Sequence, residues 1–341
     1  MKAHAIAPAL LAALASPAAW PQAAHDALQP AGPQAAHIAS LWWLAVAICA
    51  VVFVAILAAL AWALWRAPRA QASTPPEISP PPAAERRHAR GVAVALGVCI
   101  VLLVVILVGS ISTDRALASL PLQDAVHIDL TGHQWWWEAT YDDPQPDRIF
   151  HTANELHVPV GRPVIVTLHS DDVIHSFWVP SLDGKKDLIP GRTAQIEFRA
   201  DRPGDYRGQC AEYCGLQHAF MALDVIAMPP GEYAAWAEAQ RRPAADPADP
   251  QARRGRDLFL SGTCMMCHAI LGTTASARSA PDLTHVASRA RIAAGRLANT
   301  PENLAAWIHD PQAIKPGANM PANLLAPDDL HAVVAYLETL R

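Results

Sequence analysis

Residues 210–221 read CAEYCGLQHAFM and place four potential metal ligands in one short stretch. They comprise two thiols four residues apart, an imidazole and a thioether, on Cys210, Cys214, His218 and Met221. Another imidazole, on His175, lies upstream in the run DDVIHSFWVPS. Thiolate, thioether and imidazole ligands favour copper over magnesium or calcium. Because one Cys with His and Met would suffice for a single blue-copper ion, the second Cys and second His predict two coppers bridged by two thiolates.

A zinc site or a disulfide would account for fewer of these residues. A zinc site uses Cys and His ligands but has no need of the Met221 thioether. A disulfide between Cys210 and Cys214 leaves His175, His218 and Met221 without a role. We therefore favour copper, with zinc and a disulfide as the alternatives.

The sequence around the copper motif predicts a small β-sandwich or barrel over residues 115–240. Short runs rich in β-branched residues alternate there with Pro-Gly pairs, which are strand and turn signals. These runs are Val126–Leu130, Pro163–His169 and Ala194–Phe198. Residues 229–240, PPGEYAAWAEAQ, begin with proline and place Tyr233 and Trp236 three apart, which predicts a short closing helix.

The other close cysteine pair lies in the motif CMMCH at residues 264–268. C-x-x-C-H is the attachment signature of c-type haem, in which two thiols add to the haem vinyl groups and the adjacent imidazole ligates the iron. A thioredoxin-like pair would need a βαβ context, and a zinc knuckle would need another cysteine pair. The motif therefore predicts covalent haem c held by Cys264, Cys267 and His268.

The second axial ligand of this haem is expected downstream of the motif. Met320, in the Gly- and Pro-bounded run KPGANMP, is the only methionine after the haem motif. His285, His309 and His331 are the alternatives, and a thioether would raise the reduction potential relative to a second histidine. We expect Met320 to be the ligand.

Helical patterns surround the haem motif over residues 251–341. Gly255 and Phe259 lie on an expected helix before the motif, Thr300-Pro301-Glu302 begins another with a cap, and residues 327–340 carry an apolar helical stripe. Residues 241–250, RRPAADPADP, contain three prolines and no apolar periodicity, which predicts a linker. We expect an all-α haem domain joined to the β-domain by this linker.

The apolar excess of the chain lies near its N-terminus. Residues 1–19 combine the lone Lys2 with a short apolar run and small residues, which predicts a cleavable signal peptide. Two longer runs without charged residues, 38–65 and 91–109, are long enough to cross a hydrocarbon core of roughly 30 Å. Both are therefore predicted to be transmembrane helices, and the chain is expected to be a multidomain membrane protein.

Charge sets the expected orientation of these helices. The connecting loop, residues 66–90, is proline-rich and contains five arginines, whereas residues 20–37 contain no Lys or Arg. Cytoplasmic loops carry the excess of positive charge. The loop is thus expected to be an extended cytoplasmic connector, with everything after residue 109 on the periplasmic side of a bacterial inner membrane.

The charge pattern also bears on partners. The chain has a formal net charge of -5 and no basic run interleaved with aromatics, which argues against a nucleic-acid partner. Residues 115–240 carry eighteen acidic against nine basic side chains. We expect this domain to attract basic partners in a salt-sensitive manner.

Residues 38–228 resemble the family of cytochrome oxidase subunit II. The family's copper motif C-x-E-x-C-x-x-x-H-x-x-M is met by residues 210–221, its upstream histidine motif by residues 172–176, and its aromatic stretch by residues 132–137, GHQWWW. Trp136 departs from the family, which usually has Tyr there. Residues 251–341 resemble small bacterial cytochromes c, with three helices around one haem.

The resemblance implies a mixed-valence dinuclear copper centre, CuA, in a cupredoxin-like β-barrel. Cys210 and Cys214 would bridge both coppers, and His175 and His218 would each bind one. The weak ligands would be the thioether of Met221 and a backbone carbonyl oxygen of the loop.

That carbonyl would belong to Glu212, whose carboxylate would also reach a magnesium ion at the boundary with the catalytic subunit I. Trp135 corresponds to the aromatic residue through which family members accept electrons from cytochrome c. Both roles follow from the resemblance alone.

The expected function is electron relay in a terminal respiratory oxidase. Electrons would come from a soluble or membrane-bound cytochrome c, or from an upstream quinol-oxidising complex, and pass through haem c and CuA to subunit I, where oxygen is reduced to water. The alternatives are the CuA subunit of a nitric-oxide-reducing relative and a copper-binding protein without turnover. A quinol-oxidising relative would be expected to lack the copper ligands.

Overall fold

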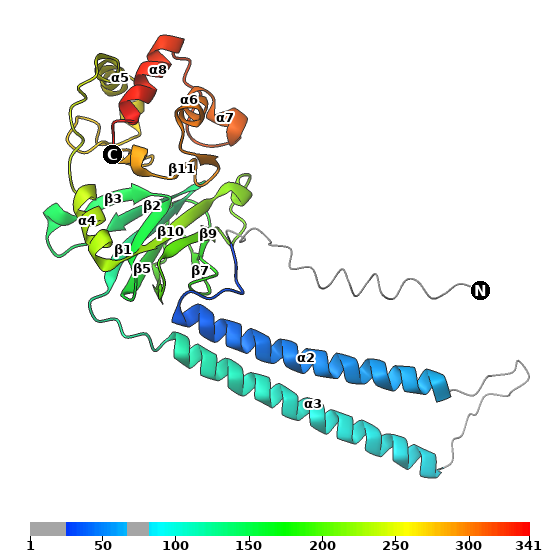
Figure 1. Ribbon diagram of the computed structural model, residues 1–341. Coiled ribbons are helices and arrows are strands. Elements are labelled where there is room, and N and C mark those ends of the chain that lie inside the picture. Colours follow the sequence, from blue (N-terminus) through cyan, green and yellow to red (C-terminus); the bar gives the residue numbers. More distant parts are fainter. Residues whose placement is uncertain (1–24, 67–81) are drawn as a thin grey trace, which may run out of the picture.

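The computed structural model describes residues 25–66 and 82–341. These residues are arranged in three layers (Figure 1). The β-domain lies between two long helices on one side and a helical C-terminal domain on the other. The predicted signal peptide at residues 1–19 lies outside the described residues.

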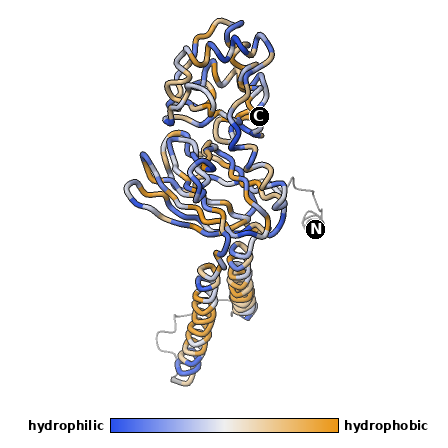
Figure 2. Tube along the Cα trace, turned by 90° about the vertical axis from the view of Figure 1, so that its left-hand side faces the viewer, coloured by the Kyte–Doolittle hydropathy of each residue, from blue (hydrophilic) through white to orange (hydrophobic). Residues whose placement is uncertain are grey.

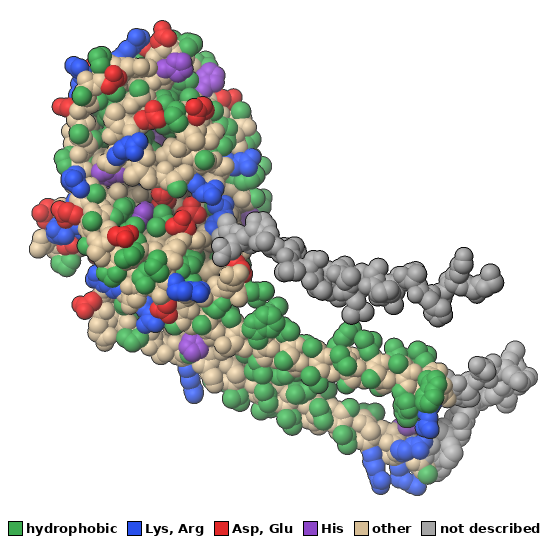
Figure 3. Space-filling model, viewed as in Figure 1, with side chains coloured by type: hydrophobic (Ala, Val, Ile, Leu, Met, Phe, Trp, Pro, Cys, Tyr) green, Lys and Arg blue, Asp and Glu red, His purple; other side chains and the backbone are tan. Residues whose placement is uncertain are grey.

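The anchor consists of helices α2 (Pro33–Arg66) and α3 (Pro82–Leu117), both long and apolar enough to cross a membrane. Their middle sections are hydrophobic in Figure 2, and Figure 3 shows Lys and Arg gathered at the end remote from the β-domain. The helices approach closely at Gly109. A Cβ atom added to this glycine would lie 3.2 Å from Cδ2 of Leu44.

The connector differs in part from its expected extended form. Residues 82–90 form the first turns of α3, whereas residues 67–81 lie outside the described part of the chain. After Pro82 the segment AAERRHAR contains no further proline and consists mainly of Ala, Glu and Arg, which are strong helix formers. Helix propensity therefore extends α3 beyond the apolar run.

The β-domain is built from ten strands in three sheets. The largest sheet has the order β3-β2-β1-β5-β8, the next β4-β10-β9, and the smallest pairs β6 with β7. The strand bounds are β1 Val126–His133, β2 Trp136–Tyr141, β3 Phe150–Ala153, β4 Glu155–Pro159, β5 Pro163–Ser170, β6 His175–Trp178, β7 Lys185–Leu188, β8 Ala194–Arg199, β9 Gly204–Gln209 and β10 Ala222–Met228.

The predicted strands are confirmed as β1, β5 and β8, which are neighbours in the large sheet. β1 and β5 pair in parallel with Ile128 opposite Val166, and both side chains are buried. The core also contains aromatic residues from several strands, including Trp137, Phe177 and Phe198. The predicted closing helix is confirmed as α4 (Pro230–Gln240), which packs on β4.

The segment before α2 is bonded to the β-domain and is called the N-terminal strap (residues 25–32). The amide of Ala31 donates to the carbonyl of Ser181 at 2.7 Å, and the carbonyl of Ala31 accepts from the amide of Asp201 at 2.8 Å. A Cβ atom at Gly32 would lie 2.1 Å from the carbonyl oxygen of Arg199, so only glycine fits there. The strap therefore joins the first anchor helix to the β-domain through backbone contacts.

The C-terminal domain contains helices α5 (Pro250–Ser261), α6 (Pro301–His309), α7 (Pro311–Ile314) and α8 (Pro327–Leu337). The cap predicted at Thr300 is confirmed, because its side chain accepts from the amide of Asn303 at 3.3 Å. A small strand pair, β11 (Arg291–Ile292) with β12 (Leu297–Ala298), adds to the helical fold that the sequence indicates.

Helices α5 and α8 cross at Gly255, where a Cβ atom would lie 1.8 Å from the carbonyl oxygen of Ala332. We expect Gly255→Ala to destabilise the C-terminal domain by about 1–3 kcal/mol or more, because backbone must move to relieve the clash. The loss corresponds to roughly 4–8 °C in melting temperature per kcal/mol. Thermal unfolding followed at the haem absorption band measures it.

The matched control is Gly231→Ala in α4, where no heavy atom lies within 4 Å of the added Cβ. This variant should melt like the unmodified chain. Equal melting temperatures for the Gly255 and Gly231 variants would contradict the assignment of Gly255 as the point of closest helix contact.

Candidate metal and haem sites

The candidate copper ligands converge at one end of the β-domain. The loop 210–221 connects β9 to β10, and it is closed at its base by a hydrogen bond from the amide of Cys210 to the carbonyl of Met221, at 2.9 Å. His175 is the first residue of β6 and is fully buried. A histidine 35 residues before the loop is therefore held beside it by the fold.

The sulfur and nitrogen atoms of this cluster lie within a few ångströms of one another. The Sγ atoms of Cys210 and Cys214 are 3.7 Å apart, and both cysteines are free. Each faces one imidazole: Cys210 Sγ lies 3.9 Å from His175 Nδ1, and Cys214 Sγ lies 3.6 Å from His218 Nδ1. The remaining donor, Met221 Sδ, lies 3.8 Å from Cys214 Sγ.

This donor set fits a thiolate-bridged metal centre. Thiolate–metal bonds are about 2.3 Å long for zinc, so two sulfurs on one ion of similar size lie no more than about 4.6 Å apart. The distance of 3.7 Å between the two Sγ atoms satisfies that limit. Two thiolates, two imidazoles and a thioether are the soft and borderline ligands that copper prefers.

The electrostatics of the two thiols are coupled. The hydrogen bond between the two thiols lowers the pKa of Cys210 and raises the pKa of Cys214, which burial raises further. Burial alone would lower the pKa of His175, but its contacts with Cys210 and Asp172 raise it. Because both thiols have to be ionised to bridge, a positively charged metal has to supply the compensating charge.

Asp172, the first residue of the upstream histidine motif, orients the His175 ring, a role that the motif alone does not specify. Its Oδ1 lies 2.8 Å from His175 Nε2, which leaves Nδ1 facing the thiols. The backbone amides of Gln134 and Val173 both donate to the same carboxylate at 2.6 Å. A carboxylate on the far nitrogen of a histidine ligand fixes the orientation of the ring and raises its basicity.

The β1–β2 turn supports the copper loop from the other side. Gln134 Nε2 and Trp135 Nε1 both donate to the carbonyl of Cys214, at 2.8 and 2.9 Å. The Cys210 thiol donates to the carbonyl of Glu212 at 3.2 Å, so this carbonyl faces the ligand cluster. The half-exposed carboxylate of Glu212 lies 3.5 Å from Lys185 Nζ.

The haem motif forms the short helix η3 (Cys264–Met266) and the turn after it, directly after α5. Cys264 is partly buried and Cys267 is exposed, and neither forms a disulfide. His268 Nδ1 lies 2.7 Å from the carbonyl oxygen of Pro281, which leaves Nε2 available for iron. Two free thiols with an oriented imidazole fit covalent haem c.

The downstream candidates for the second iron ligand have different surroundings. Met320 is partly buried and packs on the same hydrophobic cluster as Cys264. His309 and His331 are exposed on α6 and α8. His285 is buried, but its Nε2 is within hydrogen-bond distance of the carbonyl oxygen of Gln240, at 3.1 Å. These surroundings favour Met320.

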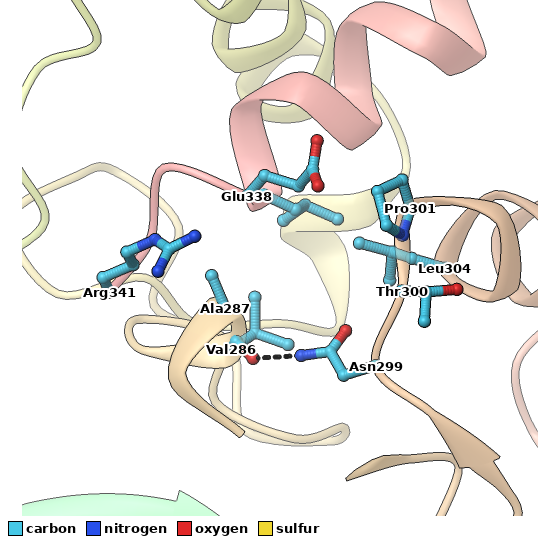
Figure 4. A pocket seen from close by; sticks show the side chains of 9 residues that line it. Val286, Ala287, Asn299, Thr300, Pro301, Leu304, Glu338 and Arg341 are labelled. Atoms are coloured by element: carbon cyan, nitrogen blue, oxygen red, sulfur yellow. Dashed lines mark hydrogen bonds between the residues drawn. The ribbon is translucent and has the colours of Figure 1, made fainter. Parts of the chain in front are cut away.

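A separate small hollow of about 80 Å³ lies between the end of α8 and the start of α6 (Figure 4). Its lining includes Asn299, Thr300, Glu338 and Arg341 and none of the haem-motif residues. Ligand pockets are typically about 300–1,000 Å³, so this hollow is too small for haem.

Trp135 is covered by the chain's own C-terminal domain and is only 8% exposed. A Cβ atom at Gly317 would lie 3.5 Å from Cη2 of the Trp135 ring, so the backbone of that loop packs on the indole. An external cytochrome c therefore does not reach this ring while the domains are packed as in the structure.

The chain matches two family profiles. The family described as Cytochrome C oxidase subunit II, periplasmic domain, matches residues 144–228, and the family described as Cytochrome c matches residues 252–341. Both profiles lie in one chain, in the order that the copper and haem motifs indicate.

Relatives named Cytochrome c oxidase subunit 2 extend this similarity. The protein of Alkalihalophilus pseudofirmus is 42% identical over 219 residues, which cover 64% of this chain and 62% of the relative. That of Bacillus subtilis is 33% identical over 230 residues, covering 64% and 63%. The chain thus spans less than two thirds of the length of these two relatives.

The protein of Bacillus sp. strain PS3 is 32% identical over 262 residues, covering 71% of this chain and 72% of the relative. Among solved structures, the periplasmic domain of subunit II of cytochrome oxidase from Bradyrhizobium japonicum is 33% identical, with a TM-score of 0.33. It covers 36% of this chain and 97% of its own. The chain belongs to the cytochrome c oxidase subunit 2 family and carries a cytochrome c domain.

The contact between Asp172 and His175 generates a test of the copper site. We expect Asp172→Asn to weaken copper binding by about 10–100-fold, because the imidazole loses the charged group that orients it. Competition between the copper-depleted full chain and a chelator of known affinity measures the change.

Asp171→Asn is the control, because that carboxylate lies 3.4 Å from His133 and makes no contact with His175. It should bind copper like the unmodified chain. If both variants kept the unmodified affinity, Asp172 would have no part in holding the ligand.

Proposed function

We propose that this chain is the electron-accepting subunit of a terminal respiratory oxidase. Electrons would reach the C-terminal cytochrome c domain and pass one at a time to the β-domain, which carries the candidate copper ligands and is called the copper domain below. They would then leave for a catalytic subunit that reduces oxygen to water. The observation that carries the proposal is the packing of the cytochrome domain on Trp135, whose indole is hydrogen-bonded to the Cys214 carbonyl.

The proposed copper site is CuA, which would supply a one-electron couple when bound. Cys210 and Cys214 would bridge, His175 and His218 would each hold one ion, and Met221 would be a weak ligand. The short distances among their donor atoms support this assignment.

The Glu212 carbonyl would complete the weak ligands, and its carboxylate would bind magnesium at the boundary with subunit I. Because this carboxylate is 43% exposed, it is accessible to a partner. Its neighbour Lys185 would then have to move aside.

The proposed haem c would supply the second one-electron couple. Cys264 and Cys267 would bind it covalently, and His268 and Met320 would ligate the iron. The bond between His268 and the Pro281 carbonyl and the partly buried position of Met320 support these roles.

The proposed location is the bacterial inner membrane, with both redox domains in the periplasm. The two apolar helices would pack on subunit I and other oxidase subunits, which their exposed apolar surfaces support. The donor would be a soluble or membrane-bound cytochrome c or an upstream quinol-oxidising complex. Since Trp135 is covered, Trp135 would accept electrons from the chain's own cytochrome domain.

The test of this function uses the native complex purified with its partner subunits. We expect reduced cytochrome c to drive oxygen uptake, measured with an oxygen electrode. Nitric-oxide consumption without oxygen uptake would support the nitric-oxide-reducing alternative. Consumption of neither gas by a complex that retains copper and haem would support a copper-binding role without turnover.

Substitution of a cysteine in one pair should disrupt the site of that pair and leave the other site intact. In Cys210→Ser a harder oxygen replaces a bridging thiolate and binds copper poorly. The copper absorption should disappear while covalent haem remains reducible, and oxygen uptake should fall to background. In Cys267→Ser covalent haem attachment should be impaired while the copper spectrum remains.

Cys99→Ser, in α3, is the control, because Cys99 is remote from both sites and should change neither spectrum. Absorption spectra and copper and haem analysis of each full-length variant give the result. Loss of haem in Cys210→Ser would refute the division of the four cysteines.

A further inference from the structure

The cytochrome and copper domains meet through a buried polar contact made by Lys315, which follows α7. Lys315 is 3% exposed, although lysine is almost never fully buried without a partner. Its Nζ donates to the carbonyl oxygen of Trp135 at 2.6 Å and to that of Ala293 at 3.3 Å. One bond thus crosses to the β1–β2 turn of the copper domain and the other ties Lys315 to its own domain.

Both acceptors are neutral backbone carbonyls. Burial lowers the pKa of Lys315 to about 7, and no carboxylate among the described residues contributes to the shift. Removing an ammonium group from water is unfavourable, and these two hydrogen bonds offset only part of that cost. A methionine of similar length would fill the same space without the desolvation, so packing alone does not account for a lysine here.

Further bonds fix the loop that follows Lys315. Gln312 Nε2 donates to the carbonyls of Ala318 and Met320, at 2.7 and 2.9 Å, and Gln312 Oε1 accepts from the amide of Gly317 at 2.8 Å. Gln217, from the copper loop, donates to the carbonyl of Pro316 at 2.7 Å. The loop 315–320 is therefore braced within its own domain and bonded to the copper domain.

This loop connects the two candidate redox sites. One of its ends carries Met320, and the other carries Lys315 on the backbone of Trp135. The Trp135 indole in turn donates to the carbonyl of Cys214. A displacement of Lys315 therefore changes the position of the Met320 loop relative to Trp135 and the copper loop.

We propose that Lys315 is a positioning residue that holds the cytochrome domain in a fixed position against Trp135. It thereby sets the geometry for electron transfer between the two domains. The inference rests on the proposed relay function. It concerns one electron passing from the cytochrome domain to the copper domain, with no proton or group transferred.

The first test is a transfer rate in the full chain, loaded with haem and copper in detergent. A light-activated reductant reduces the haem, and the haem and near-infrared copper bands are followed after the flash. We expect Lys315→Met to slow transfer by about 10–100-fold, because small misplacements have effects of that size. Both absorption spectra and both reduction potentials should remain unchanged, which separates positioning from damage to either site.

Lys186→Met is the matched control, because Lys186 is exposed on β7 and forms no ion pair among the described residues. It should transfer at the unmodified rate. Transfer at the unmodified rate in Lys315→Met would overturn the role of Lys315 and leave the relay intact. Absence of transfer in the unmodified chain would overturn the relay, and the inference with it.

A second measurement is independent of redox activity and of the variant's folding. Acylation of the unmodified, copper-free chain by a water-soluble amine reagent, followed by mass spectrometry, compares Lys315 with Lys186. The buried Lys315 should react at least about tenfold more slowly, because an amine that is 3% exposed meets the reagent only when the contact opens. Equal or faster labelling of Lys315 would refute the docked geometry.

Discussion

The proposed function depends on one constraint, which is that two thiols are held 3.7 Å apart in a loop closed between two paired strands. β9 and β10 fix both ends of that loop, and the β1–β2 turn bonds to its middle at the Cys214 carbonyl. The β5–β6 connection supplies His175 and Asp172 to the same end of the domain. Three connections that are distant in sequence therefore define one site, and its geometry depends on the whole β-domain.

The type and spacing of residues are enough to identify the candidate ligands, because few kinds of site combine thiols, imidazoles and a thioether in this way. The anchor helices and α4 are equally local signals. Most strands were not predictable in this way, since β9 and β10 gain their stability from each other and from β4. Lys315 shows the same limit, because its partner Trp135 is 180 residues away and is set by tertiary packing.

The contact between the two redox domains is polar for a buried interface. Besides Lys315, Glu155 is 3% exposed and accepts from the amide of Ala290 at 3.3 Å, and burial raises the pKa of Glu155 to about 7. Contacts between domains of one chain resemble transient protein–protein interfaces and are more polar than obligate ones. The covalent linker raises the effective concentration of one domain near the other, so a weak interface can still be populated.

The N-terminal strap has a consequence for the order in which the chain folds. Because Ala31 and Gly32 bond to or pack against backbone of the β-domain, the polypeptide just before α2 is a structural part of that domain. The partners of the strap, at Ser181 and Asp201, follow both anchor helices in the chain. The strap can therefore bind only after the β-domain, which follows both helices in the chain, has been synthesised and has folded.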